Sequence, residues 1–155
     1  MRSITFLILA LSVFYTTTIT AQQHYQWNNI AFTLEDHYEV VLQEEAAFAA
    51  IGDGLEISVA AFENADIDVE DITALTVEMA LEENLEAVDD ADVIELNGLV
   101  GAYVEGYKNG DRVFCMGMIN PQTNGNFFVM ITFGDVDEWA EDAAINILNS
   151  FRHSR

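Results

Sequence analysis

The chain has 155 residues, of which 51% are hydrophobic and 11% aromatic, and its 27 acidic residues against 5 basic ones give a formal net charge of −22 at pH 7. This length and hydrophobic content predict one folded domain with a core of its own and exclude a disordered chain. The charge excludes nucleic acid and anionic membrane surfaces as partners, because an acidic surface repels both.

Residues 1–21 have the pattern of a secretory signal peptide. Arg2 gives a positive start, an apolar run extends from Ile4 to Tyr15, and the small residue Ala21 precedes the expected cleavage point. The apolar run is shorter than the roughly 20 residues of a membrane span, and no cysteine stands at the cleavage point to carry a lipid anchor. We therefore expect an exported protein, periplasmic or extracellular and not lipid-anchored, whose residues 22–155 form a single domain.

The first part of that domain predicts β-strands. Residues 22–29 are polar with interspersed aromatic residues and predict an N-terminal arm. The sequence Gly52-Asp53-Gly54 predicts a hairpin turn, because glycine and aspartate tolerate the positive φ that tight turns require. Strands are expected on both sides of it, at residues 30–34, 38–43, 47–51 and 55–62.

An acidic loop at residues 63–71 and a helix at residues 71–88 follow. The apolar residues of this helix recur at helical spacing and predict one buried stripe. The carboxylates at four-residue spacing on another face repel each other, so packing rather than surface pairing must hold the helix. The stripe comprises Ala74, Val77, Leu81, Leu85 and Val88.

The acidic loop invites comparison with a calcium site. Asp66, Asp68 and Glu70 alternate as at the start of an EF-hand loop, but Asp71 and Val77 stand where that loop needs glycine and glutamate. We therefore expect Asp68 or Asp71 to cap the helix, with weak cation binding by the segment 63–95 as the alternative.

The last part of the chain predicts more strands and a final helix. Strands are expected at residues 93–96, 99–107, 112–119 and 127–133, and the last two are apolar on both faces and so need cover on both faces. The helix begins at the capping residue Asp135 and places Trp139 in the core. The predicted fold class is α+β, a three-layer α/β/α sandwich with an antiparallel sheet of about seven strands and a helix on each face.

The sequence offers no recognisable catalytic, cofactor-binding or metal-ligating residues. His24, His37 and His153 are scattered without metal-ligand spacing. Cys115, the only cysteine, excludes an internal disulfide and is expected to be an inert core thiol. No serine stands in a nucleophile elbow, and no phosphate-binding loop occurs. We therefore expect a protein that is not an enzyme and needs no cofactor.

Three stretches carry a family resemblance. They are residues 32–40 (FTLEDHYEV), 96–103 (LNGLVGAY) and 144–152 (AINILNSFR). In order and spacing they resemble the PsbP-like fold of small exported bacterial proteins of the DcrB type. That resemblance implies an antiparallel sheet between helices, an accessory or protein-binding role, and no shared catalytic residues.

These observations favour a non-enzymatic exported accessory or protein-binding module, which engages an envelope or secreted protein through one sheet edge or helix face. The first alternative is a cation or small-ligand binder that uses the acidic segment 63–95. The second is a hydrolase with an unrecognised carboxylate pair.

Overall fold

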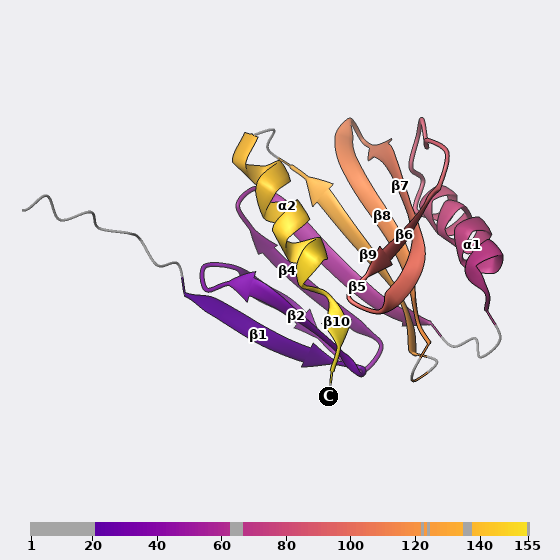
Figure 1. The fold of residues 1–155 in the computed structure, drawn as a ribbon. Helices are drawn as coiled ribbons and strands as arrows, with labels where there is room; N and C mark the ends of the chain where they lie inside the picture. The colour runs from indigo at the N-terminus through magenta and orange to yellow at the C-terminus, as the bar shows by residue number, and fades with distance from the viewer. Residues whose placement is uncertain (1–20, 63–66, 122, 124, 135–137, 155) are drawn as a thin grey trace, which may run out of the picture.

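The computed structural model describes residues 21–62, 67–121, 123, 125–134 and 138–154. These ranges contain ten strands and two helices (Figure 1). The elements are β1 Gln22–Trp27, β2 Ile30–Glu35, β3 Glu39–Gln43, β4 Ala47–Gly52, β5 Leu55–Phe62, α1 Val69–Glu82, β6 Asp92–Leu96, β7 Leu99–Lys108, β8 Asp111–Asn120, β9 Gly125–Phe133, α2 Glu138–Ser150 and β10 Arg152–His153.

Seven strands form one large sheet in the order β3-β4-β5-β9-β8-β7-β6, and all neighbours are antiparallel. Three of its hairpins turn through two residues with positive φ. These are Asp53-Gly54, Asn97-Gly98 and Asn109-Gly110. The predicted hairpins at Gly54 and Gly110 are therefore confirmed, for the reason that the sequence suggested.

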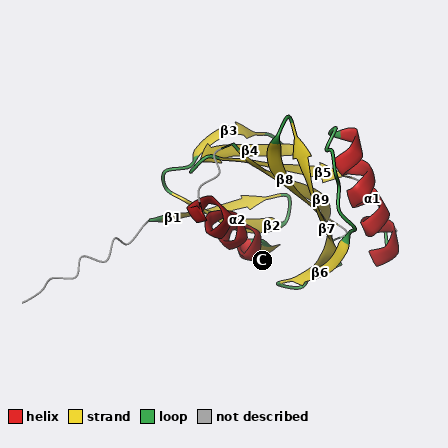
Figure 2. Cartoon of the chain, turned by 90° about the horizontal axis from the view of Figure 1, so that it is seen from above, coloured by secondary structure: helices red, strands yellow, loops and turns green. Residues whose placement is uncertain are grey.

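A second sheet, in the order β1-β2-β10, lies with α2 against the concave face of the large sheet (Figure 2). The main core fills the space between these layers, and aromatic rings dominate it. The ring of Phe32 on β2 stacks on Phe151 at 4.8 Å between centroids and meets Phe48 of the large sheet edge-on at 5.0 Å. Rings of this size bury large apolar areas, so this cluster holds the two sheets together.

Helix α1 covers the outer face of the large sheet over β7 and β8 (Figure 1). Ala80 and the following Leu85 pack there against Val104, Val113 and Cys115. Asp68 caps the helix by accepting hydrogen bonds from the backbone N–H groups of Glu70 and Asp71.

The predicted three-layer α/β/α sandwich is wrong. Strand β2 does not join the large sheet but pairs with β1 and β10, so the inner face is covered by a second sheet together with α2. Residues 22–29, predicted as an arm, provide strand β1, which makes this second sheet possible. The result is a mostly β fold with a single helix on each side.

The predicted stripe of α1 is only partly correct, since Leu85 is buried and Val77 and Val88 pack partly against the same cluster, but Leu85 and Val88 lie beyond the end of the helix. The helix begins at Val69, ends at Glu82 and buries Ile72, Thr76 and Ala80, whereas Leu81 of the predicted stripe is 58% exposed. The helix lies so close to the sheet that a Cβ added at Gly117 would come within 2.2 Å of the Thr76 hydroxyl. This close approach suits the small buried residues Thr76 and Ala80, so hydrophobicity alone does not determine the buried face.

The second helix departs from expectation at one aromatic residue. Trp139 is 69% exposed rather than part of the core, while Ala140, Ala144 and Ile147 of the same helix are buried. The predicted cap Asp135 and the predicted signal peptide, except Ala21, lie outside the described residues. Neither helix in the described ranges is long and apolar enough to cross a membrane.

Candidate functional site: an apolar groove beside strand β6

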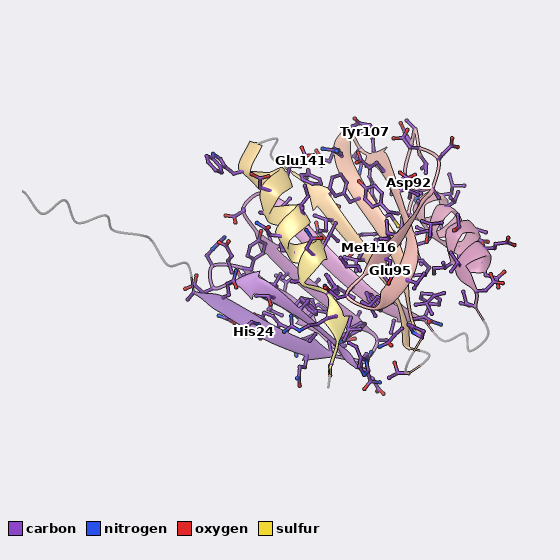
Figure 3. The ribbon with its side chains drawn as sticks, viewed as in Figure 1. His24, Asp92, Glu95, Tyr107, Met116 and Glu141 are labelled. Carbon is purple, nitrogen blue, oxygen red and sulfur yellow. The ribbon has the colours of Figure 1, made fainter. Side chains whose placement is uncertain are left out.

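An open groove of about 270 Å³ lies between β6 and α2. Met116 of β8 and Tyr103 of β7 contribute to its lining from the sheet, and Figure 3 labels Met116 together with Glu95 of β6. Ile145, on the helical side, is 43% exposed although it is a large apolar residue. The full lining is Ile94, Glu95, Leu96, Tyr103, Met116, Ile145, Leu148 and Asn149. Most of these side chains are apolar, which is the composition of a site that binds apolar groups.

The groove adjoins an open sheet edge. Strand β6 is the last strand of the large sheet, and within the described residues only β7 pairs with it. Leu96 and Leu99 flank the two-residue turn at Asn97-Gly98 and therefore form a backbone hydrogen-bonded pair. From this pair onward, opposite residues of β6 and β7 alternate between pairs that share backbone hydrogen bonds and pairs that do not. The backbone N–H and C=O groups of Glu95 and Val93 therefore point away from β7. An extended chain could pair with them.

A side-chain amide fixes the end of the groove that lies at the β6–β7 turn. Asn97, in the β6–β7 turn, donates hydrogen bonds of 2.8 Å to the backbone carbonyl oxygens of both Asn149 and Phe151. These carbonyls lie at the C-terminus of α2, where the helix itself leaves carbonyl groups without partners. The turn and the helix end are thereby held together.

A charged network fixes the other end of α2 to the sheet. Arg112 of β8 donates two hydrogen bonds to the Glu105 carboxylate, at 2.9 and 3.0 Å, and lies 3.3 Å from a carboxylate oxygen of Glu141 on α2. The guanidinium also lies 4.5 Å from the centre of the Phe114 ring. Burial opposes the charge of Arg112, but Glu105 and Glu141 together raise its pKa above the ordinary value. Arg112 is therefore charged at all physiological pH values.

The same network reaches the lining of the groove through Tyr103. Its hydroxyl donates a short hydrogen bond to Glu105. Burial, and then this hydrogen bond and the charge of Glu105, raise the pKa of Tyr103 above its ordinary value. Tyr103 therefore stays neutral and fixed in position as part of the groove lining.

The two elements that flank the groove carry exposed acidic residues. Asp92 and Glu95 are exposed on β6, and Glu141 and Asp142 are exposed on α2. No lysine or arginine lines the groove among the described residues. The groove therefore combines a mostly apolar lining with acidic residues on both flanking elements.

A second hollow, of about 410 Å³, lies on the opposite face beside α1. Its charged groups are in part already paired, since Lys108 Nζ lies 2.9 Å from a carboxylate oxygen of Glu83. Met79 and Glu83 come from the acidic segment 63–95, but Asp68 and Asp71 of that segment have their carboxylates in the helix cap. The cap that the sequence predicted is confirmed, while residues 63–66 of the segment lie outside the described ranges.

The structure separates the three histidines but gives one of them carboxylate neighbours. His24 contacts Thr33, and His153 contacts Asn120. His37 Nε2 lies 2.6 Å from a carboxylate oxygen of Asp53, and its Nδ1 lies 3.6 Å from one of Glu35. The spacing Glu35-x-His37 was a weak local signal for this group, but Asp53 belongs to a different hairpin that no sequence pattern connects to it.

Cys115 is buried as expected of a core thiol. Burial, followed by the charge of Glu83, raises its pKa to about 12. A thiol with this pKa holds almost no thiolate near neutral pH and is a poor nucleophile.

The chain matches no known sequence family, and no curated protein matches it in sequence. A protein from Bacteroides thetaiotaomicron VPI-5482 shares the fold with a TM-score of 0.51 and 13% identity, over 82% of this chain and 46% of its own, so this chain spans about half the length of that protein. LpqN of Mycobacterium tuberculosis, described as involved in cell envelope biogenesis, has a TM-score of 0.52 and 14% identity over 90% of this chain and 88% of its own. At these identities the likeness shows the fold alone. The finer resemblance to PsbP-like proteins of the DcrB type stays a prediction.

Proposed function

We propose that this chain is a non-enzymatic accessory module of the bacterial envelope or secretome, which binds a partner protein through the groove between β6 and α2. The observation that carries the proposal is the continuity of the groove with the open edge of β6. An extended partner segment that pairs with β6 would lay alternate side chains over the groove.

The exposed apolar residues support this choice of surface. Ile145 on α2 is 43% exposed, and Ile94 and Leu96 of β6 line the groove beside it. The other outer strand of the large sheet, β3, is less suitable, because its pairing with β4 shifts register between Val40 and Leu42. Such a bulge twists an edge away from further pairing, as natural proteins do to protect edges.

The partner segment should be basic and alternately apolar. Glu95 lines the groove, Asp92 and Asp142 are exposed on the two elements that flank it, and the whole chain carries a formal net charge of −22. Complementary charge would accelerate association and select against acidic partners, while apolar side chains in the groove would supply affinity. Nucleic acid and anionic membranes are not proposed as partners, because the same charge repels them.

The likeness to LpqN supports an envelope role by analogy only. LpqN has nearly the same length as this chain, and its description as a protein of cell envelope biogenesis agrees with the export predicted from residues 1–21. Because one fold serves many functions, this analogy supports the proposed location in the envelope and says nothing about the identity of the partner.

A defined peptide tests the proposal. A fluorescent peptide of alternating leucine and lysine residues should bind the protein, and a peptide with glutamate in place of lysine should not. The variant Ile145→Lys should abolish binding because it places a cation in the groove and repels the peptide. Leu81→Lys is the matched control, since Leu81 is an exposed apolar residue on α1, away from the groove.

A second variant separates strand pairing from groove filling. Val93→Pro removes the outward N–H of β6 and should weaken peptide binding while circular dichroism shows that the sheet remains. Equal binding by the wild-type protein, Ile145→Lys and Val93→Pro would overturn the proposal. So would equal weakening by Ile145→Lys and Leu81→Lys, because binding would then reflect surface charge alone.

A further inference from the structure

Three side chains with metal-binding atoms converge at one end of the fold, away from the groove. The ligand atoms of Glu35, His37 and Asp53 all lie within 4.8 Å of one another. Glu35 ends β2, His37 lies in the turn that leads to β3, and Asp53 lies in the β4–β5 turn. Residues far apart in sequence are thus brought to one place by two adjacent turns.

These turns are held in a fixed relation to each other. The backbone N–H of Tyr38 donates to the carbonyl oxygen of Glu35 at 3.2 Å, which closes the first turn. In the second turn Asp53 has a φ of 51°, a conformation available to aspartate in tight hairpins. The Tyr38 ring packs against Gly52 so closely that an added Cβ there would come within 2.7 Å of it. The cluster therefore rests on a rigid base.

The two carboxylates lie at different distances from the ring nitrogens of His37, and only one of them accepts a hydrogen bond. The 2.6 Å between Nε2 and Asp53 is the length of a strong hydrogen bond, which assigns the proton to Nε2 and leaves the Nδ1 lone pair free when the ring is neutral. The 3.6 Å between Nδ1 and Glu35 is too long for a hydrogen bond. It is close to the roughly 3.4 Å that separates a nitrogen and an oxygen bound to one tetrahedral zinc ion.

The two carboxylates of the cluster also have few positively charged neighbours. The Tyr38 side chain is 5% exposed, and its hydroxyl makes no hydrogen bond of normal geometry although the carboxylates of Asp53 and Glu35 lie near enough to act on it. Among the described residues, the ion pairs of Glu35 and Asp53 are made with His37 alone. Two carboxylates therefore lie beside His37 with no lysine or arginine paired to them in the described part of the chain.

We propose that Glu35 and His37 bind a divalent transition-metal ion such as Zn²⁺, with His37 Nδ1 and the Glu35 carboxylate as ligands and Asp53 as the residue that orients the imidazole. A carboxylate that accepts the other ring N–H of a metal-bound histidine is a recurrent arrangement, because it fixes the tautomer and increases the basicity of the ligand. Water would complete the coordination, since all three side chains are about two-fifths exposed. The imidazole ligand selects zinc-like ions over Ca²⁺ and Mg²⁺, which prefer oxygen.

Isothermal titration calorimetry at pH 7.5 tests this site with ZnCl₂ and, separately, with CaCl₂. The wild-type protein should bind one Zn²⁺ with micromolar affinity and show no comparable site for Ca²⁺. His37→Ala and Glu35→Gln should remove the binding, and Asp53→Asn should weaken it by about tenfold, which is the usual effect of losing an orienting carboxylate. His24→Ala and Glu82→Gln are the matched controls, because they remove an exposed histidine and an exposed carboxylate elsewhere and should leave the affinity unchanged.

Nitrogen-15 NMR of the histidine rings gives a second readout that is independent of affinity. Zn²⁺ should shift the Nδ1 resonance of His37 and leave both nitrogens of His24 unchanged. The site is disproved if Zn²⁺ fails to bind, or if His37→Ala binds as tightly as the wild type, which would indicate diffuse attraction to the acidic surface. It is also disproved if Zn²⁺ shifts Nε2 instead of Nδ1, because Asp53 would then not be the orienting residue.

Discussion

The side-chain amide of Asn97 donates a 2.8 Å hydrogen bond to the carbonyl oxygen of Phe151, across 54 residues of sequence. A second bond of 2.8 Å from the same nitrogen reaches the Asn149 carbonyl. Asn97→Asp should therefore lower the free energy of unfolding by about 1–3 kcal/mol, because two hydrogen bonds are lost and a carboxylate faces two carbonyl oxygens. Urea unfolding followed by circular dichroism measures the change.

Asn97→Gly is the matched control for the turn itself. Asn97 has a φ of 50°, which glycine adopts more easily than any other residue. This variant should lose the same two hydrogen bonds without adding repulsion, so its stability should lie between those of the wild type and Asn97→Asp. A wild-type stability for Asn97→Asp would contradict the role assigned to this amide.

The pair formed by Arg112 and Glu105 should couple more strongly than the pair formed by Lys108 and Glu83. Two parallel hydrogen bonds join the first pair, whereas the second has a single close contact of 2.9 Å. Double-mutant cycles with glutamine at each position should give a coupling of about 1 kcal/mol for Arg112–Glu105 and well below 0.5 kcal/mol, roughly the typical surface value, for the lysine pair. Equal couplings would show that solvent screens both pairs alike.

The hairpins of the large sheet were the most predictable part of this fold. The turn formed by Asp53 and Gly54 and the turn formed by Asn109 and Gly110 have compositions that suit one backbone conformation, so local chemistry was sufficient to place them. Strand β5 coincides with its prediction, at Leu55–Phe62. The division into two sheets was not predictable in this way, because the pairing of β2 with β10 depends on contacts between Ala31 and Arg152 at opposite ends of the domain.

The candidate sites were less predictable because each is built from distant segments. The groove combines Ile94 of β6 with Ile145 of α2, and neither residue has a pattern that reveals its neighbour. The burial of α1 shows the same limit: Leu81 fitted the apolar period, but Gly117, which the helix approaches closely, lies on β8. Hydrophobic periodicity describes one element, and close packing depends on two.

Gly117→Ala should test that close packing. A Cβ at this position would come within 2.2 Å of Thr76 Oγ1 and 2.9 Å of the Phe128 ring, so α1 would have to move away from the sheet. Overpacking of this kind costs about 1–3 kcal/mol. Gly134→Ala is the matched control, because the nearest atom to its Cβ would be at an ordinary 3.4 Å. Thermal unfolding should show a lower midpoint for the first variant alone, and equal midpoints would disprove the contact.

Cys115 should make the protein less stable in alkaline solution. Burial raises the pKa of its thiol from an ordinary 9.0 to about 12. Between these values the unfolded chain releases the proton and the folded chain keeps it, so the unfolded state binds fewer protons and stability falls as pH rises. At pH 10 this amounts to about 1.4 kcal/mol relative to neutral pH.

Cys115→Ala isolates this contribution, since the tyrosines and all other titrating groups are unchanged. The variant should be less stable than the wild type at pH 7.5 because it leaves a small cavity. The stability difference between the two proteins should shrink by about 1.4 kcal/mol at pH 10, because only the wild type loses stability by keeping a thiol protonated in the folded state. Guanidinium unfolding at both pH values gives the two differences. A constant difference would mean that the Cys115 thiol titrates alike in the folded and unfolded chains, and that its burial against Val104 and Val113 is looser than the structure indicates.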